Sequence, residues 1–356
     1  MKAVVQPVAD AESSDRAALS ARGVTIYQVA ERAGVSASTV SRVLRGTQPV
    51  APATAERVRA AVAELRYRPS RLGVALAERR HAANGIVFPD LAGPFYTEVV
   101  LGYEEVAAEL GHSVLILSTR DRPDAGQMVL SLADRVDGMV LFGRTVEDDI
   151  VREVVQAGVP VLLLARPEIA EADSISTHNT ETAGELARHL LDHGYRKIVF
   201  LGDPGGSQDA QQRWDGVARA LGEAGLSTRS ALVRCGFDET AGRKTARRLL
   251  TRRTPPEALM CFNDEVALGA LLAAEELGLR IPKDIALTGW DDVMAARFAR
   301  PGLTTVRQPM RELGAQAARA LDERISGGRT ETVHRTLPTD LVIRQSCGEH
   351  KKEYTR

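Results

Sequence analysis

Apolar residues recur at helical spacing near the N-terminus of this 356-residue chain, whereas the rest of the chain alternates between short apolar runs and amphipathic stretches. Over residues 25–65, three stretches place apolar side chains three and four positions apart, which predicts three short helices. Beyond residue 80, apolar runs such as "GIVF" and "GMVLFG" alternate with amphipathic stretches such as "YTEVVLGYEEVAAELG". This alternation is typical of βαβ units in a parallel, doubly wound sheet. The pattern predicts a small all-α unit followed by a larger α/β body.

The first two predicted helices form a helix-turn-helix pattern. Thr25 and Gln28 are spaced as a capping box, Gly34 ends the first helix, and Ser36 can cap a second helix over 37–44. The inward positions predicted for the second helix are Val40, Val43 and Leu44. Two short helices around a glycine turn can place the second helix in a DNA major groove. The alternative is an ordinary helical hairpin with a solvated arginine face.

A third helix is predicted to close a three-helix core. Pro52 suits its first turn, whereas Ala51 before it offers no capping side chain. Its apolar positions at helical spacing are Val58, Ala61, Val62 and Leu65.

Charge divides unevenly along the chain, whose net charge is −1. Residues 23–80 hold ten arginines, no lysine and four glutamates, a net of +6. Since the first 22 residues balance at three charges of each sign, residues 81–356 carry −7. A basic head on an acidic body indicates a polyanion-binding module attached to a unit with another task.

Two long stretches resemble the lac-repressor/galactose-repressor (LacI) family: "TIYQVAERAGVSASTVSRVLRG" and "VRAAVAELRYRPSRLGVALA" match its headpiece and hinge. The resemblance continues through "CFNDEVALGALLAAEELGLRIPKDIALTGWDD" and "PGLTTVRQPMRELG" and so spans Val24 to about Ser346. It implies an all-α helix-turn-helix headpiece with a hinge helix, then a periplasmic-binding-protein-like effector domain of two doubly wound parallel sheets. It also implies a repressor that binds palindromic operator DNA as a homodimer under the control of a sugar-like effector.

The expected organisation follows from pattern and resemblance together. It comprises a flexible tail (1–22), the DNA-binding domain (23–68), a hinge (69–80), an effector-binding and dimerisation domain (81–346) and a polar tail (347–356). The chain is expected to cross between the two lobes near residues 178, 309 and 338. The last residues lack heptads, so a dimer is expected without a tetramerising coiled coil.

The resemblance assigns DNA contacts residue by residue. The positions that match base-reading residues are Ala37, Ser38 and Arg42, of which Arg42 can bind guanine with two hydrogen bonds. The positions expected mainly to hold phosphates are Thr25, Tyr27, Ser36, Thr39, Ser41 and Arg45. Arg71 is a further expected DNA contact. Leu76 matches a leucine that wedges into the minor groove, although it could instead pack within a linker helix.

Candidate effector contacts lie at predicted strand ends. The residues concerned are Phe95, Arg166, Arg213, Phe237, Asn263, Trp290 and Asp291. A guanidinium, an amide and a carboxylate can each bridge neighbouring hydroxyl groups, and aromatic faces can pack against a sugar ring. The alternatives are helix capping for Asn263 and Asp291 and core packing for the aromatic residues.

One departure from the family affects the expected ligand. Ala165 stands where many sugar-binding members carry an acidic residue, so a hydroxyl partner is missing. The ligand could lack that hydroxyl, could carry a negative charge accepted by Arg166, or could be something other than a sugar.

Other functional classes find little support. "LGDPGGSQ" fits neither G-x-G-x-x-G nor a Walker pattern, and no catalytic or metal-ligand spacing or cofactor motif stands out, so an enzyme is not expected. A two-lobed solute-binding receptor without a DNA role remains as an alternative. Three cysteines without C-x-x-C spacing, no export signal and no apolar run of roughly 18 residues favour a cytoplasmic protein that does not enter a membrane.

Overall fold

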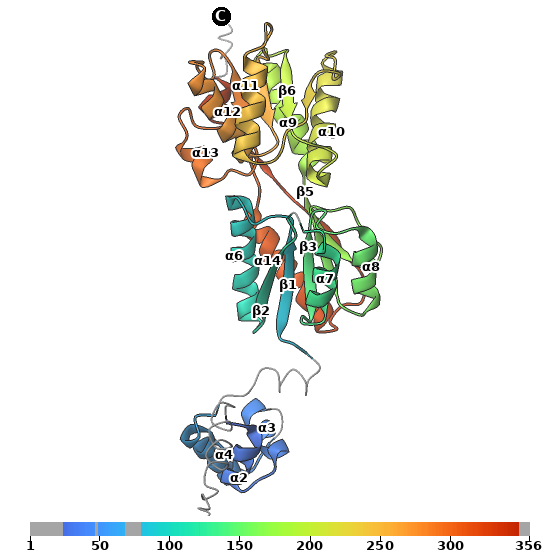
Figure 1. Ribbon diagram of the computed structural model, residues 1–356, viewed down its shortest axis with the longest axis vertical. Coiled ribbons are helices and arrows are strands. Elements are labelled where there is room, and N and C mark those ends of the chain that lie inside the picture. The colour runs from blue at the N-terminus through green and yellow to red at the C-terminus, as the bar shows by residue number, and fades with distance from the viewer. Residues whose placement is uncertain (1–23, 47–48, 68–79, 121, 349–356) are drawn as a thin grey trace, which may run out of the picture. The chain divides into compact units, whose positions relative to one another are not determined.

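The computed structural model describes residues 24–46, 49–67, 80–120 and 122–348. The chain divides into two compact units, one up to His81 and one from Ala82 onward, and each has its own core (Figure 1). The predicted N-terminal tail, most of the predicted hinge with Arg71 and Leu76, and residues 349–356 lie outside the described residues, as does the side chain of Arg45.

Three helices form the N-terminal unit: α2 (Ile26–Ala33), α3 (Ala37–Arg45) and α4 (Pro52–Glu64). Thr25 and Gln28 form the predicted capping box, and Gly34 ends α2 in the left-handed conformation that glycine adopts without strain (φ 66°). Val29, Val40 and Val58 are fully buried at the centre of the unit. The prediction that Leu44 faces inward is wrong, because its side chain is 37% exposed.

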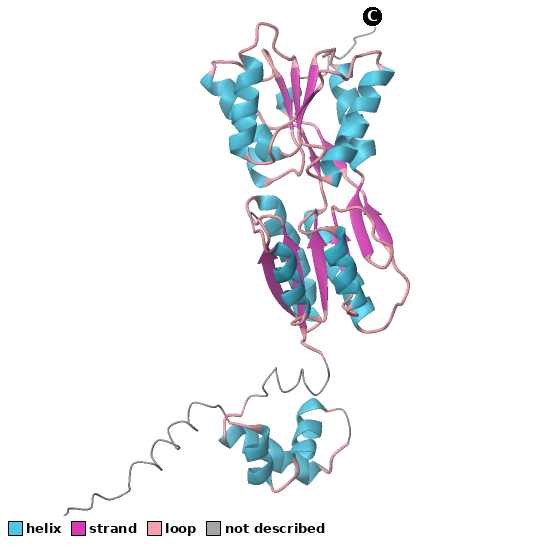
Figure 2. Cartoon of the chain, turned by 45° about the vertical axis from the view of Figure 1, so that its right-hand side comes forward, coloured by secondary structure: helices cyan, strands magenta, loops and turns pink. Residues whose placement is uncertain are grey.

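The second unit contains two lobes, each with a parallel sheet between helices (Figure 2). The strands of the N-terminal lobe, in sheet order, are β11 (His334–Leu337), β5 (Asp173–Thr177), β4 (Val161–Leu164), β3 (Gly138–Phe142), β1 (Ala83–Phe88) and β2 (Ser113–Ser118). Helices α6 (Pro94–Glu109) and α14 (Met310–Ile325) cover one face, and α7 (Ala125–Ala133) and α8 (Asp148–Gln156) cover the other.

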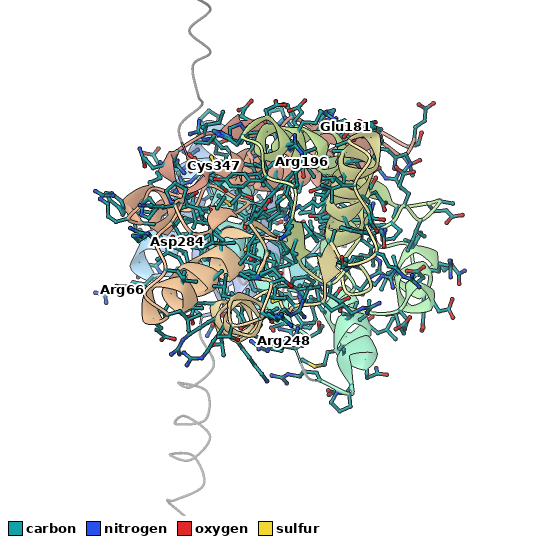
Figure 3. All side chains as sticks on the ribbon, turned by 90° about the horizontal axis from the view of Figure 1, so that it is seen from above. Arg66, Glu181, Arg196, Arg248, Asp284 and Cys347 are labelled. Atoms are coloured by element: carbon teal, nitrogen blue, oxygen red, sulfur yellow. The ribbon has the colours of Figure 1, made fainter. Side chains whose placement is uncertain are left out.

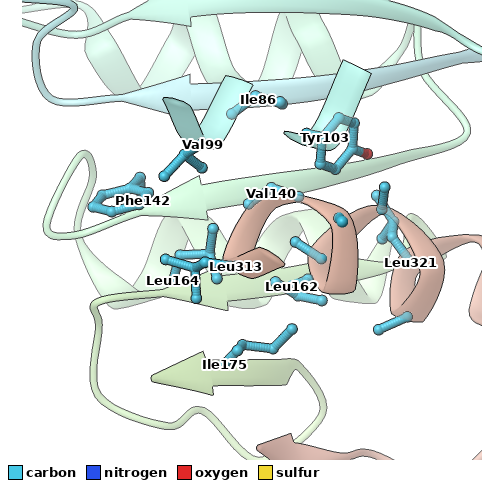
Figure 4. Packing of buried hydrophobic residues seen from close by; sticks show 14 of the residues in the cluster. Ile86, Val99, Tyr103, Val140, Phe142, Leu162, Leu164, Ile175, Leu313 and Leu321 are labelled. Atoms are coloured by element: carbon cyan, nitrogen blue, oxygen red, sulfur yellow. The ribbon is translucent and has the colours of Figure 1, made fainter. Parts of the chain in front are cut away.

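Strand periodicity explains this arrangement. Val140 and Phe142 on β3 face α6 and α14, whereas Met139 and Leu141 between them face α7 and α8 (Figure 4). Because both faces of the sheet are covered, each central strand is apolar at successive positions.

The C-terminal lobe repeats the plan with a smaller sheet. Its strands, in sheet order, are β7 (Leu232–Val233), β6 (Ile198–Leu201), β8 (Ala258–Cys261) and β9 (Ala286–Thr288). Helices α9 (Asn179–Asp192) and α10 (Gln208–Glu223) cover one face, and α11 (Glu239–Leu250) and α12 (Asp264–Glu276) cover the other. The short helix α13 (Met294–Phe298), the antiparallel pair β10 (Thr305–Arg307) and β12 (Asp340–Val342), and a 3-10 turn (Gln345–Cys347) complete this lobe.

The chain passes between the lobes at three places. It does so at His178 between β5 and α9, at residues 308–309 between β10 and α14, and at residues 338–339 between β11 and β12. Each lobe is therefore assembled from segments that are far apart in the sequence.

The C-terminal lobe reaches further than predicted. Cys347 was assigned to the polar tail, but its side chain is fully buried in the core. Ser346 beside it donates a hydrogen bond to the carbonyl of Leu287 and accepts one from the amide of Thr304. No helix among the described residues is long and apolar enough to span a membrane.

The missing N-cap of α4 gives a test of the headpiece. Ala51 occupies the cap position and makes no side-chain capping bond. We expect Ala51→Ser to stabilise α4 by about 0.5–1 kcal/mol, because the new hydroxyl can accept from an amide of the first turn. Hydrogen exchange of the α4 amides in the whole protein measures this.

Ala60→Ser is the matched control, since Ala60 is exposed in the middle of the same helix. Serine there has no capping role and a lower helix propensity than alanine. Equal protection in the two variants would contradict the capping argument.

Candidate nucleic-acid interface and ligand cleft

The described DNA-contact candidates of the headpiece lie at the start of α2 and along α3. Tyr27 is 74% exposed, and Ser38 and Arg42 are also exposed. Ala37, Thr39 and Ser41 are partly buried, and Ala37 packs against the three-helix core. Ser38 and Arg42 lie on the side of α3 opposite the buried Val40, so the helix presents one polar face.

Two of these residues also have a structural task. Thr25 caps α2, and Ser36 caps α3 by accepting from the amide of Thr39 at 3.2 Å. The Ser36 hydroxyl also lies 2.8 Å from that of Ser38. Capping leaves the first turns of both helices ordered, and the amides of a helix N-terminus favour a nearby anion.

Arg42 is the cation best placed on the polar face of α3. Its side chain lies back along the helix, with Nε 3.4 Å from the carbonyl of Ser38. By contrast, Arg32 forms an ion pair with Glu64 at 2.8 Å, which joins α2 to α4. Among the described residues no carboxylate pairs with Arg42, so its guanidinium is available to a base edge or a phosphate.

A cavity of about 380 Å³ lies between the two lobes of the second unit. This volume falls in the range of small-molecule sites. Residues at the carboxyl ends of strands form its walls: Phe142 at the end of β3, Ala165 after β4, Asn263 after β8 and Asp291 after β9. Strand ends are the expected position for a ligand in an open parallel sheet.

Aromatic side chains from both lobes face the cavity. In the N-terminal lobe, Phe95 and Tyr96 each meet Phe142 edge to face, with ring centroids 5.7 and 5.3 Å apart. In the C-terminal lobe, Phe237 packs on Phe262 at 4.5 Å. Phe95 and Phe237 therefore both line the cavity, where their rings present apolar surface.

Arg213 is a buried cation at the floor of the cavity, with only 2% of its surface exposed. It donates from Nε to Oδ1 of Asn179 (2.8 Å) and from a terminal nitrogen to the carbonyl of Phe262 (2.7 Å). The second terminal nitrogen lies 3.6 Å from Asp209. Its guanidinium carbon also lies 4.5 Å from the ring centre of Phe262 and 4.3 Å from that of Trp290. This cage fixes the guanidinium in one position.

Trp290 supports the site from behind and does not line the cavity, so its prediction as a direct contact is wrong. It is 2% exposed, and its ring packs against Arg213 in the core of the lobe. The polar residue that follows it, Asp291, is the one that faces the cavity.

Asp291 is an acidic residue at the floor of the cavity, near Arg213. It accepts a hydrogen bond from Nε2 of Gln308 at 2.6 Å and lies in a positive-φ conformation (φ 114°). Burial raises the pKa of Asp291 to about 7, although the charge of Arg213 and the Gln308 hydrogen bond both act to lower it. Gln308 also accepts from the hydroxyl of Thr177 at 3.0 Å, so it connects the cavity floor to two lobe crossovers.

Asn263 both caps a helix and lines the cavity, the two roles that were alternatives for it on sequence grounds. Its Oδ1 accepts from the amide of Val266 and caps α12, its amide donates to the carbonyl of Phe237, and it lines the cavity. Asp264 and Asp292 are buried away from the cavity. Asp264 accepts from the amide of Val293 and the hydroxyl of Thr305, and Asp292 pairs with arginines including Arg307.

Arg166 does not face the cavity, contrary to the prediction. Its side chain is buried, donating to Asp148 (2.6 Å) and to the carbonyl of Gly143 (3.2 Å). Ala165 before it has a positive φ of 51° and is the residue that lines the cavity. Because Asp148 already neutralises Arg166, it is not positioned to accept an anionic ligand.

The cavity also includes residues that the sequence prediction missed. These are Asp90, Arg120, Phe142, Arg144, Asp209, Asp238, Glu265 and Gln308, with smaller neighbours. Several follow predicted strands within two residues, so a systematic inspection of every strand end would have found Asp90, Phe142 and Arg144. Asp209 lies in the first turn of a helix and carries no such indication.

A helix-turn-helix unit and a two-lobed binding unit in one chain define a class of protein: a DNA-binding regulator that senses a small molecule. The chain belongs to the lacI family of bacterial regulatory proteins. The family described as "Bacterial regulatory proteins, lacI family" matches residues 25–70, and the "Periplasmic binding protein-like domain" matches residues 187–347. The family and fold class predicted from the sequence are thereby confirmed.

Similar proteins extend over nearly the whole chain. Catabolite control protein A of Priestia megaterium is 31% identical over 91% of this chain and 99% of its own length. A lac repressor dimer solved with operator and the anti-inducer ONPF is 30% identical over 92% of this chain and 100% of that one, with a TM-score of 0.83. The regulator CelR in its complex with cellobiose is 31% identical over 91% of this chain and 99% of that one, with a TM-score of 0.70.

The raised pKa of Asp291 predicts a pH-dependent stability. In the unfolded chain the carboxyl has its ordinary pKa of 3.8, whereas in the folded protein its pKa is about 7. Between these values the folded state binds more protons, so Asp291 makes the protein less stable as pH rises through this window. We expect wild-type protein to lose more stability than Asp291→Asn from about pH 5 to about pH 8, as measured by urea unfolding.

Asp284→Asn is the control for this experiment. The guanidinium of Arg280 holds the pKa of Asp284 at about 2, so the contribution of Asp284 is lost only when the pH falls through the acid range. Parallel curves for wild-type protein and Asp291→Asn would show that Asp291 keeps an ordinary pKa.

Proposed function

We propose that this protein is a transcriptional repressor of the LacI type that binds a palindromic operator as a homodimer. It is a regulator and not an enzyme, and its DNA affinity follows a small polyhydroxylated effector in the inter-lobe cavity. The polar face of α3 with Arg42 supports the DNA role, and the lac repressor relative is bound to operator as a dimer. Two headpieces on one duplex also supply the contact area that a single small unit lacks.

The observation that carries the effector proposal is the composition of the cavity. Rigidly held Arg213, Asn263 and Asp291 provide donors and an acceptor at one wall, while Phe95 and Phe237 provide apolar faces. Hydroxyl groups satisfy the polar residues and ring C–H groups cover the aromatic ones, which is the chemistry of a sugar or sugar derivative. The cellobiose complex of CelR is consistent with this class of ligand.

The effector would act through the lobe crossovers. A ligand that contacts both lobes favours one lobe arrangement only by the difference in its affinity for the two arrangements. Gln308 links Asp291 to Thr177, so a ligand that changes the hydrogen bonding of Asp291 acts directly on two crossing segments.

Selection from a pool of random duplexes tests the DNA role. We expect the full-length protein to enrich a palindrome, and Arg42→Ala to bind it about 10- to 100-fold more weakly, because one base contact is worth about 1–3 kcal/mol. Arg57→Ala on the exposed side of α4 is the control and should change little. A solute-binding receptor without a DNA role would enrich no sequence in any ligand state.

The effector role is tested on the selected operator with a panel of mono- and disaccharides. We expect one class of sugar to shift operator affinity, and Asp291→Ala to keep operator binding while needing at least 10-fold more sugar, since a hydrogen bond to a charged group contributes about 1.5–3 kcal/mol. Asp284→Ala, an exposed acid on the same lobe, is the control. An unchanged sugar response in Asp291→Ala would place the effector elsewhere.

A further inference from the structure

Outside the cavity, one cluster of metal-ligating side chains lies in the C-terminal lobe. His189 and His193 are on α9 and at its C-cap, and Cys347 comes from the 3-10 turn at residues 345–347. One ligand atom from each residue lies within 4.8 Å of the other two. Among the described residues, no other group of three such side chains comes this close.

The helix brings the two histidines together. Residues four apart lie on the same face of a helix, and the ring centroids of His189 and His193 are 4.7 Å apart. Cys347 reaches them although it is 158 residues from His189 in sequence, with Sγ 3.1 Å from Nε2 of His189. Figure 3 views the lobe from the end at which Cys347 lies.

These distances are close to those of a tetrahedral metal site. Zinc binds histidine nitrogen at about 2.0–2.1 Å and cysteine sulfur at about 2.3 Å, which places its ligand atoms roughly 3.3–3.6 Å from one another. Small rotations of the three side chains would therefore bring them to the required separation. Imidazole and thiolate are the ligands that zinc and its neighbours in the first transition row prefer over magnesium or calcium.

Hydrogen bonds hold Cys347 and its neighbours in place around the sulfur atom. The hydroxyl of Thr304 lies 3.1 Å from Sγ of Cys347, and the hydroxyl of Tyr195 donates to the carbonyl of Cys347 at 3.1 Å. Ser346 is anchored to Leu287 by its own hydroxyl. Contacts of this kind fix the orientation of metal ligands in proteins.

The three candidate ligands differ in solvent exposure, which leaves a route by which a cation can reach them. Cys347 and His189 are buried, at 0% and 6% exposed, whereas His193 is partly exposed at the end of α9. A cation could enter past His193 and keep a water molecule as its fourth ligand.

We propose that His189, His193 and Cys347 bind a divalent cation of the zinc type. As the metal–sulfur bond forms, the thiol proton passes to solvent. The metal joins the 3-10 turn at residues 345–347 to α9 and so fastens the last segment of the C-terminal lobe to its core. This site is separate from the effector cavity, and it does not depend on the proposed function.

Cobalt titration of the full-length, chelator-treated protein tests the proposal. We expect one equivalent of Co²⁺ to give the visible bands of a tetrahedral site and a thiolate-to-cobalt charge-transfer band, and Zn²⁺ to displace it. Cys347→Ser should abolish the charge-transfer band, whereas Cys235→Ser, which removes a buried thiol elsewhere in the lobe, should retain it.

His193→Gln is the second variant, because it changes a partly exposed position and preserves the core. It should weaken Co²⁺ binding at least 10-fold, and Zn²⁺ should raise the thermal unfolding midpoint of wild-type protein and Cys235→Ser but not of His193→Gln. Absence of cobalt bands in wild-type protein, or an unchanged cobalt spectrum in either Cys347→Ser or His193→Gln, would overturn the proposal. The three residues would then be a hydrogen-bonded part of the core.

Discussion

The binding cavity depends on a single desolvated cation. Removing the guanidinium of Arg213 from water is costly, and the structure compensates with Asn179, the Phe262 carbonyl, nearby carboxylates and two aromatic rings. The partners come from several elements, so the cation also contributes to how α9, α10 and the ends of β8 and β9 meet. Loss of any one partner would leave this buried charge less fully compensated.

The same cation acts on two neighbouring acids that line the cavity. Burial raises the pKa of Asp209, and the charge of Arg213 and a hydrogen bond from Asn179 act to lower it. Burial likewise raises the pKa of Asp291, to about 7, against the charge of Arg213 and the hydrogen bond from Gln308. A ligand hydroxyl that donates to Asp291 would favour its ionised form, so the charge of Asp291 would depend on whether a ligand is bound.

Much of this organisation could be predicted from the sequence, because it rests on local rules. Capping pairs, glycine turns and apolar runs indicated the headpiece and many of the parallel strands. Resemblance indicated Arg213, which lies in α10, and the strand-end residues Asn263 and Asp291. The wrong predictions of cavity contacts concern residues whose position in the sequence is right but whose side chains point away from the cavity. Trp290 and Arg166 lie at strand ends, yet tertiary partners turn them into the core, and Ala165 and Asp291 have backbone angles that no periodicity encodes. The burial of Cys347 likewise depends on contacts with α9, which is distant in sequence.

The three passages between the lobes have a consequence for biosynthesis. The sheet of the N-terminal lobe gains its edge strand β11 only when residues 334–337 have been made, and the C-terminal lobe gains β12 and Cys347 later still. The headpiece, by contrast, is complete by residue 67 and depends on contacts between segments close in sequence. On the ribosome the nucleic-acid reader can therefore fold long before the sensor that governs it, because the sensor cannot complete its two lobes until residues 334–347 have been made.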